Sequence, residues 1–138
     1  MSLREIVDQH YAGLNNGDVE ASTSVLAPDV STTAPGAPAM HGIDQFKPFM
    51  QGFVNAFPDA KVHPERIYEA GDSIVAEGVY SGTHTGTLVG NGMSVPPTGK
   101  RMNLHFADFF TVRDGKVVEH GIYFDQGELM QQLGLLPG

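Results

Sequence analysis

The segment Lys100–Asp125 reads KRMNLHFADFFTVRDGKVVEHGIYFD and predicts the centre of a β-sheet. Apolar and polar side chains alternate along both halves, as expected of strands that have one buried face. A turn at Asp114-Gly115 separates the halves, and Asp-Gly is a strong signal for a hairpin. We therefore predict two antiparallel strands, Lys100–Arg113 and Lys116–Phe124.

Upstream of this segment, the chain changes from helical to strand periodicity. Two more strands are predicted at Lys61–Glu69 and Ser73–Thr85, joined by a Gly-Asp turn. Before them, apolar residues recur at i, i+3, i+4 and i+7, the spacing of a helix with one buried face. The remaining predicted elements are helices at 3–16, 18–26, 42–56 and 127–133, a short strand at Val30–Thr33 and an irregular loop, PGAPAMHG, at 35–42. Helices followed by a meander of strands predict an α+β fold in which helices cover one face of a curved antiparallel sheet.

Composition narrows the functional classes. The chain has 138 residues, suited to one domain spanning 1–138, and a formal net charge of -8. With no basic cluster and no apolar run of about 18 residues, we expect neither nucleic acid nor a membrane as partner. No secretory leader is recognised, so we expect a cytoplasmic protein. The absence of cysteine excludes disulfides and thiolate chemistry.

Three polar side chains near the predicted hairpin are candidates for catalysis. Asp108 lies between aromatic neighbours, and an aspartate is rarely buried unless it is paired or functional. His105 falls on the opposite face of a regular strand, so a bulge would be needed to bring it beside Asp108, and it is otherwise a surface or sheet-packing histidine. Asp125 follows the last strand directly, where it can act in a pocket, cap the final helix, or do both.

The order of these elements, together with the segments GTHTG (82–86), PPTGK (96–100), RDGK (113–116) and QQLGLLP (131–137), resembles the SnoaL-like polyketide cyclases and ester cyclases of the nuclear-transport-factor-2-like superfamily. The resemblance covers nearly the whole chain. It implies a cone-shaped α+β barrel, also described as cystatin-like, in which a curved antiparallel sheet wraps around N-terminal helices. The open end of such a cone would hold a pocket.

The resemblance also implies roles for individual residues. Asp125 falls at the family's general acid/base, and Asp108 matches a position that orients the substrate. Phe110 stands where cyclases of this group often carry a histidine, which is a departure from the family pattern. His105 is the third member of the predicted catalytic set. The predicted substrate pocket is lined by Tyr11, His41, Met50, Phe53, Tyr80, His84, Phe106, Phe110 and Tyr123.

The function implied is acid/base chemistry without a cofactor on a small apolar compound that contains a carbonyl group. Asp125 would remove a proton alpha to a ketone or ester, and ring closure would follow by intramolecular aldol attack. A non-catalytic ligand-binding or dimeric scaffold protein is the alternative. Histidines at positions 10, 41 and 84 could meet at one opening, but there is no HxH or HxxxH pair and the family's cyclases work without metal, so we predict no metal site.

A homodimer is expected because strands Ser73–Thr85 and Lys100–Arg113 carry apolar residues on both faces. One face covers the helices, so the other would leave an apolar patch in water unless a second copy covered it. The alternative is that the 86–98 loop folds back over this face with Met93, Val95 and Pro96.

Overall fold

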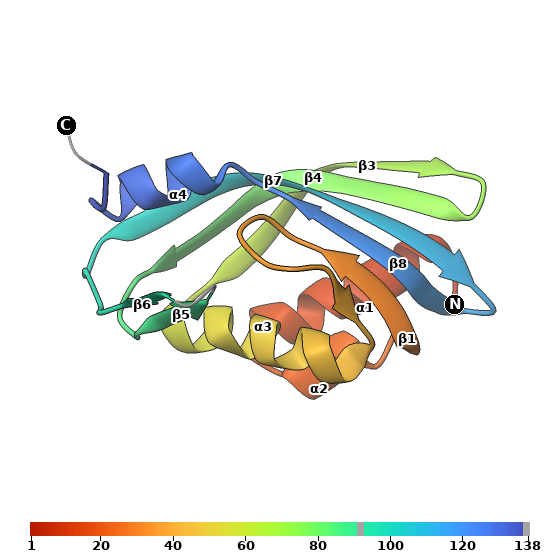
Figure 1. Cartoon of the computed structure of the whole chain (residues 1–138). Coiled ribbons are helices and arrows are strands. Elements are labelled where there is room, and N and C mark those ends of the chain that lie inside the picture. Colours follow the sequence, from red (N-terminus) through yellow and green to blue (C-terminus); the bar gives the residue numbers. More distant parts are fainter. Residues whose placement is uncertain (91–92, 137–138) are drawn as a thin grey trace.

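The structure is a computed structural model that describes residues 1–90 and 93–136. The elements follow in the order α1 (Leu3–Asn15), α2 (Val19–Thr23), β1 (Leu26–Thr33), β2 (Met40–His41), α3 (Ile43–Ala56), β3 (Lys61–Ala70), β4 (Ser73–Thr83), β5 (Leu88–Gly90), β6 (Met93–Val95), β7 (Arg101–Arg113), β8 (Lys116–Tyr123) and α4 (Gln126–Gln132). Figure 1 shows a long curved sheet with α1, α2 and α3 beneath its concave side. The predicted α+β fold is confirmed.

The main sheet has the strand order β2-β1-β8-β7-β4-β3. Strands β3, β4, β7 and β8 form the predicted antiparallel meander, and the turn at Asp114-Gly115 has both residues at positive φ. Strand β1 runs parallel to β8, which the sequence analysis did not predict. Because the two strands lie about ninety positions apart in the chain, no local sequence pattern predicts their pairing.

The predicted second helix was too long, because the chain after Thr23 is taken up by the sheet. Helix α2 ends at Thr23, and β1 starts at Leu26. Val117 of β8 donates its backbone N–H to the carbonyl of Val25, and Leu26 is buried. Pro28 lies inside β1, at a shift in register where the ladder does not need its missing N–H.

Two segments predicted as loops contain short strands. Met40–His41 forms β2 and pairs with β1, while β5 and β6 form a separate hairpin that contacts α3. The hairpin lies at the end of α3 on the concave side of the sheet (Figure 1). The described part of the 86–98 segment therefore does not cover the outer sheet face, and the side chain of Met93 lies outside the described residues.

Helices α1 and α2 pack closely against each other at Gly13 of α1. Ser2 and Glu5 form the predicted capping box at the start of α1. Near its other end, a Cβ added to Gly13 would lie 2.3 Å from the backbone nitrogen of Ser22 in α2. Only a glycine allows the two backbones to come this close, and the contact brings Ser22 against His10 one turn earlier on α1.

The outer face of the sheet exposes a group of large apolar side chains. Tyr68 of β3, Phe109 of β7 and Tyr123 of β8 are 58%, 49% and 57% exposed, and the rings of Phe109 and Tyr123 meet edge to face. We call this group the outer apolar face.

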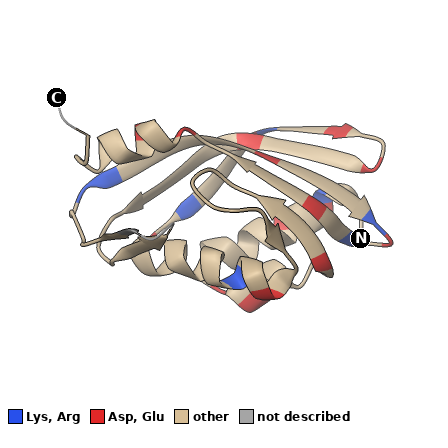
Figure 2. Cartoon of the chain, viewed as in Figure 1, with Lys and Arg blue, Asp and Glu red and all other residues tan. Residues whose placement is uncertain are grey.

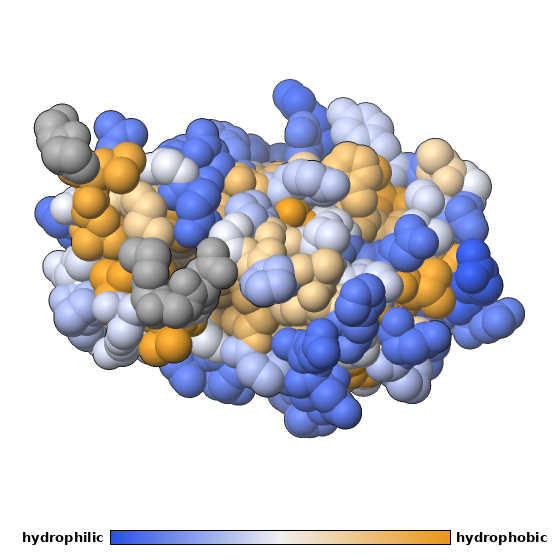
Figure 3. All heavy atoms as spheres, viewed as in Figure 1, coloured by the Kyte–Doolittle hydropathy of each residue, from blue (hydrophilic) through white to orange (hydrophobic). Residues whose placement is uncertain are grey.

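Charge and hydropathy vary over the rest of the surface. Acidic residues are spread widely and outnumber the basic ones (Figure 2). Figure 3 shows further apolar surface at the end of the molecule that carries α4 and the β5–β6 hairpin, where Val89, Leu135 and Leu136 are exposed. No helix among the described residues is long and apolar enough to cross a membrane.

Candidate active site

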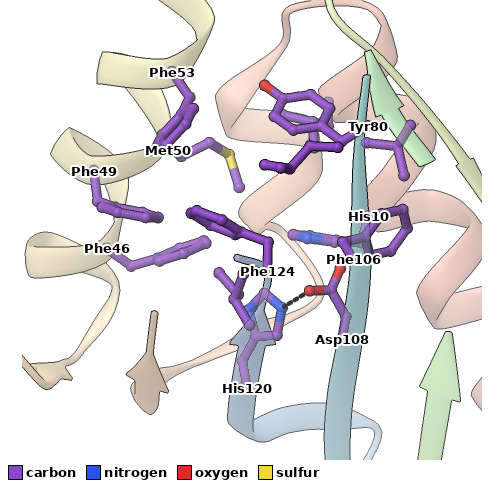
Figure 4. A pocket seen from close by; sticks show the side chains of 14 residues that line it. His10, Phe46, Phe49, Met50, Phe53, Tyr80, Phe106, Asp108, His120 and Phe124 are labelled. Atoms are coloured by element: carbon purple, nitrogen blue, oxygen red, sulfur yellow. Dashed lines mark ion pairs between the residues drawn. The ribbon is translucent and has the colours of Figure 1, made fainter. Parts of the chain in front are cut away.

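A cavity of about 90 Å³ lies between α1, α3 and the concave face of the sheet. Most of its wall is aromatic or aliphatic, and α3 supplies one side with a row of such residues (Figure 4). The polar exceptions are His10, Tyr80, Asp108 and His120. The apolar lining residues are Leu14, Phe46, Phe49, Met50, Phe53, Val62, Leu104, Phe106, Ile122 and Phe124.

Asp108 is the central polar group of this cavity. Strand β7 alternates regularly here, so Asp108 points inward with Phe106 and is only 7% exposed. Its Oδ2 accepts a hydrogen bond of 2.6 Å from the hydroxyl of Tyr11, and its Oδ1 lies 3.8 Å from Nε2 of His120. Burial, reinforced by the Asp108 carboxylate, raises the pKa of Tyr11 well above its usual value. Tyr11 therefore stays protonated and remains a donor to Asp108.

His120 of β8 brings unpaired hydrogen-bonding groups into the cavity. Its ring stacks on Phe110 at 4.5 Å between centroids and meets Phe46 edge-on. Neither ring nitrogen has a hydrogen-bond partner among the described residues, and the same holds for Oγ1 of Thr32, the residue opposite it on β1. Buried polar atoms are normally paired, so unpaired ones beside a cavity indicate where a ligand or water binds.

His10 lies at the α1 side of the same cavity. Its Nδ1 is 2.9 Å from the carbonyl oxygen of Ser22, and the Ser22 hydroxyl donates to the carbonyl of His10 at 2.8 Å. Its ring meets that of His120 edge to face at 5.4 Å. Burial, together with the neighbouring His120, lowers the pKa of His10 to about 4. At neutral pH its imidazole is therefore uncharged.

The structure brings part of the predicted site together. Met50, Phe53, Tyr80, Phe106 and Asp108 line the cavity. Tyr11 and Phe110 are buried beside it and contact the polar cluster through Asp108 and His120.

The predicted placement of Asp125 in the pocket is corrected. Strand β8 ends at Tyr123, and Asp125 is an exposed residue at the start of α4. Its side chain accepts a hydrogen bond from the backbone N–H of Glu128 at 3.1 Å, which makes it the helix cap. Within the described chain, the carboxylate that lines the cavity is Asp108 instead.

His105 and Tyr123 also lie outside the cavity. The pairing of β7 with β4 is uninterrupted from Arg101 to Thr111, so no bulge turns His105 inward, and it is exposed on the outer face. Tyr123 points outward because its neighbour on β8, Ile122, faces the cavity.

The two predicted loop histidines have other positions. His41 is exposed on β2. His84 is buried behind Phe57, and its Nδ1 accepts a hydrogen bond from the backbone N–H of Thr98, so it holds the 96–100 turn. Burial lowers the pKa of His84. Within residues 1–90 and 93–136, no three His, Asp or Glu side chains are grouped closely enough to hold a metal ion.

A second hollow lies directly outside the cavity, and we call it the outer cleft. It has a volume of about 570 Å³ and shares Phe49 and Phe53 with the cavity. Its lining includes Pro35–Ala37, parts of α3, the β5–β6 hairpin and α4, and none of these side chains is charged. Phe49 and Phe53 thus line both the cavity and the outer cleft.

Comparison with known proteins agrees with this architecture. The structure resembles that of a protein with a ketosteroid-isomerase-like fold from Catenulispora acidiphila, with 19% identity over 98% of this chain and 96% of that chain and a TM-score of 0.79, a likeness that shows the fold alone. The sequence profile of the SnoaL-like polyketide cyclases matches residues 4–133. The chain therefore belongs to the SnoaL-like polyketide cyclase family.

Two further solved structures are similar. IdmH from Streptomyces antibioticus, a candidate polyketide cyclase, is 28% identical over 95% of this chain and 97% of that chain, with a TM-score of 0.77. AclR from Streptomyces galilaeus, a candidate hydroxylase, is 25% identical over 98% of this chain and 86% of that chain, with a TM-score of 0.82. No curated protein matches this chain in sequence.

Proposed function

We propose that this protein catalyses cofactor-independent acid/base chemistry on a small, mostly apolar carbonyl compound, with Asp108 as the base. The proposal depends on one observation: among the described residues, Asp108 is the carboxylate that lines the cavity, and Tyr11 fixes one of its two oxygens. Membership of the polyketide cyclase family and the similarity to IdmH support this reaction class.

In this proposal each polar neighbour of Asp108 has a task. Oδ2 is bonded to Tyr11, so Oδ1 is the oxygen that can accept a proton alpha to a carbonyl group. The C–H electron pair then becomes an enolate, and an N–H of His120 can donate to the enolate oxygen.

Ring closure needs no further chemical group from the protein. The enolate carbon attacks a second carbonyl of the same molecule, and the new alkoxide takes the proton back from Asp108. The aromatic wall formed by Phe46, Phe49 and Phe53 would hold the molecule in a folded conformation, which supplies the proximity that this step requires.

Replacing Asp108 by asparagine should abolish proton abstraction. We expect wild-type protein to speed hydrogen–deuterium exchange at the α-carbon of at least one member of a panel of small 1,3-dicarbonyl compounds, followed by NMR in deuterated buffer. Asp108→Asn should lower this rate by about 100-fold or more, because the amide still accepts a hydrogen bond from Tyr11 but cannot take a proton.

Asp125→Asn is the matched control, since it changes the exposed cap of α4 and should leave the exchange rate as it is. Equal loss in both variants would contradict the assignment to Asp108. Tight binding of a dicarbonyl without any exchange would instead favour the alternative, a ligand-binding protein of the same fold.

We also propose that the protein forms a homodimer through the outer apolar face. Tyr68, Phe109 and Tyr123 together expose aromatic surface that water covers poorly, and the described β5–β6 hairpin does not shield it. A two-fold contact would bury the same side chains of both copies.

Phe109→Asp should convert the dimer into a monomer, because each interface would then bury two unpaired carboxylates. Light scattering at micromolar concentration is expected to give the mass of two chains for wild-type protein and one chain for the variant. Val89→Asp, which changes an apolar residue of similar exposure on β5, should remain dimeric. A wild-type mass of one chain would refute the proposal.

A further inference from the structure

The hydrogen bonds of His10 define which of its nitrogens carries the proton. A carbonyl oxygen can only accept, so the contact of 2.9 Å between Nδ1 and the Ser22 carbonyl requires a proton on Nδ1. The Ser22 hydroxyl also contacts Nδ1, but it donates its own proton to the backbone carbonyl of His10. It can therefore only accept from Nδ1, which agrees with a proton on that nitrogen. With the imidazole uncharged, the lone pair is on Nε2.

This lone pair is available to a ligand. The His10 ring lines the cavity, while its Nδ1 is bonded to α2 behind it, and Nε2 has no hydrogen-bond partner among the described residues. Figure 4 shows His10 at the same end of the cavity as Asp108 and His120, with the aromatic residues of α3 on the other side. His10 therefore belongs to the polar end of the cavity, although its neighbours on the buried face of α1 include the apolar Ile6 and Val7.

We infer that His10 presents Nε2 as a fixed hydrogen-bond acceptor to the ligand, and that the ligand carries a hydroxyl or enol group as the complementary donor. This inference rests on the proposed function only for where the ligand binds. It adds a required chemical group to the ligand, beyond the carbonyl on which Asp108 acts.

The balance of donors and acceptors in the cavity supports a donating ligand. Oδ1 of Asp108 and Nε2 of His10 both accept, and neither has a hydrogen-bond partner among the described residues. A ligand with carbonyl groups alone would bury both acceptors without partners, which opposes binding. The enol form of a 1,3-dicarbonyl compound, a β-hydroxy ketone or a hydroxylated aromatic ketone supplies the missing O–H.

The protonation state of His10 can be measured without any ligand. Two-bond proton–nitrogen NMR correlations distinguish the two neutral tautomers of histidine, and His10→Asn identifies the His10 signals by their disappearance. We expect the Nδ1-protonated, uncharged form at pH 7. A ring protonated on Nε2, or on both nitrogens, would overturn the inference.

Binding of a matched ligand pair tests the required donor. Phenol and fluorobenzene have nearly the same size, and only phenol donates a hydrogen bond. Wild-type protein should bind phenol about tenfold more tightly, as followed by NMR titration. His10→Asn should lose this preference, since its shorter amide can still donate to the Ser22 carbonyl but places no acceptor at the position of Nε2.

Asp108→Asn separates the two acceptors. If the phenol hydroxyl pairs with His10, the preference persists in this variant; if it is lost there and kept in His10→Asn, the donor pairs with Asp108 and the inference fails. Neither titration requires turnover, so absence of α-carbon exchange would refute the proposed reaction without changing these results. Should His10→Asn fail to fold, as judged by circular dichroism, the His10 signals are assigned through the backbone of the wild-type protein instead, and its tautomer still decides.

Discussion

Gly13→Ala should lower the free energy of unfolding by about 3 kcal/mol, despite placing a better helix former in the interior of α1. The added Cβ would lie 2.3 Å from the backbone nitrogen and 2.7 Å from the Cα of Ser22. Both atoms belong to the backbone of α2, so relief requires the two helices to move apart. That movement would also lengthen the contact between Ser22 and His10. Urea unfolding followed by circular dichroism measures the change in the free energy of unfolding.

Gly52→Ala is the matched control, because Gly52 also lies inside a helix. There the nearest atom to an added Cβ is the carbonyl oxygen of Val89 at 3.6 Å, an ordinary contact. The gain in helix propensity should then dominate, and stability should stay equal or rise by up to about 1 kcal/mol. Equal stability of both variants would show that α1 and α2 separate easily, and would remove the reason for the fixed position of His10.

The fold was largely predictable because its main signals are local. Alternation in Lys100–Phe124 and the Asp-Gly turn predict β7, β8 and their pairing from adjacent residues. The start of β1 was missed because it depends on a distant partner: Leu26 continues a helical pattern in the sequence but pairs with Val117 in the sheet. The strands β2, β5 and β6 have nearby partners, but they are too short to show an alternating pattern.

The site was predicted less well, for a different reason. Asp108 was found because an aspartate among aromatic residues is unusual. Strand alternation correctly placed Asp108 and His105 on opposite faces of the same strand. Asp125 was assigned to the pocket through family resemblance, although its position before a helix also predicted the cap that the structure shows.

His120 was missed, yet it shares its alternating set with Ile122 and Phe124, and this parity could have identified it as inward-facing. His10 was predicted to reach the pocket opening together with His41 and His84, but its contact with Ser22 was not predicted, since Ser22 comes from another helix.

Acidification should destabilise the protein through His10. Its pKa falls from an ordinary 6.5 to about 4 on folding, so the unfolded chain binds a proton more readily between these values. The stability that uncharged His10 contributes is therefore fully present above pH 6.5 and is lost as the pH falls toward 4. A difference of about 2.5 pKa units corresponds to about 3 kcal/mol.

Unfolding by urea at several pH values between 7.5 and 4 isolates this contribution when wild-type protein is compared with His10→Asn. Asp108, His120 and Tyr11 also surround the ring and are present in both proteins, so they contribute to both curves, while the difference between the curves reports His10. The variant should be less stable than wild type at pH 7.5 and should lose less stability on acidification. His41→Asn changes an exposed histidine and should follow the wild-type curve. Parallel curves for wild type and His10→Asn would mean that burial does not hold His10 uncharged, and the fixed acceptor at Nε2 would then have no basis, because a doubly protonated ring offers a ligand only donors.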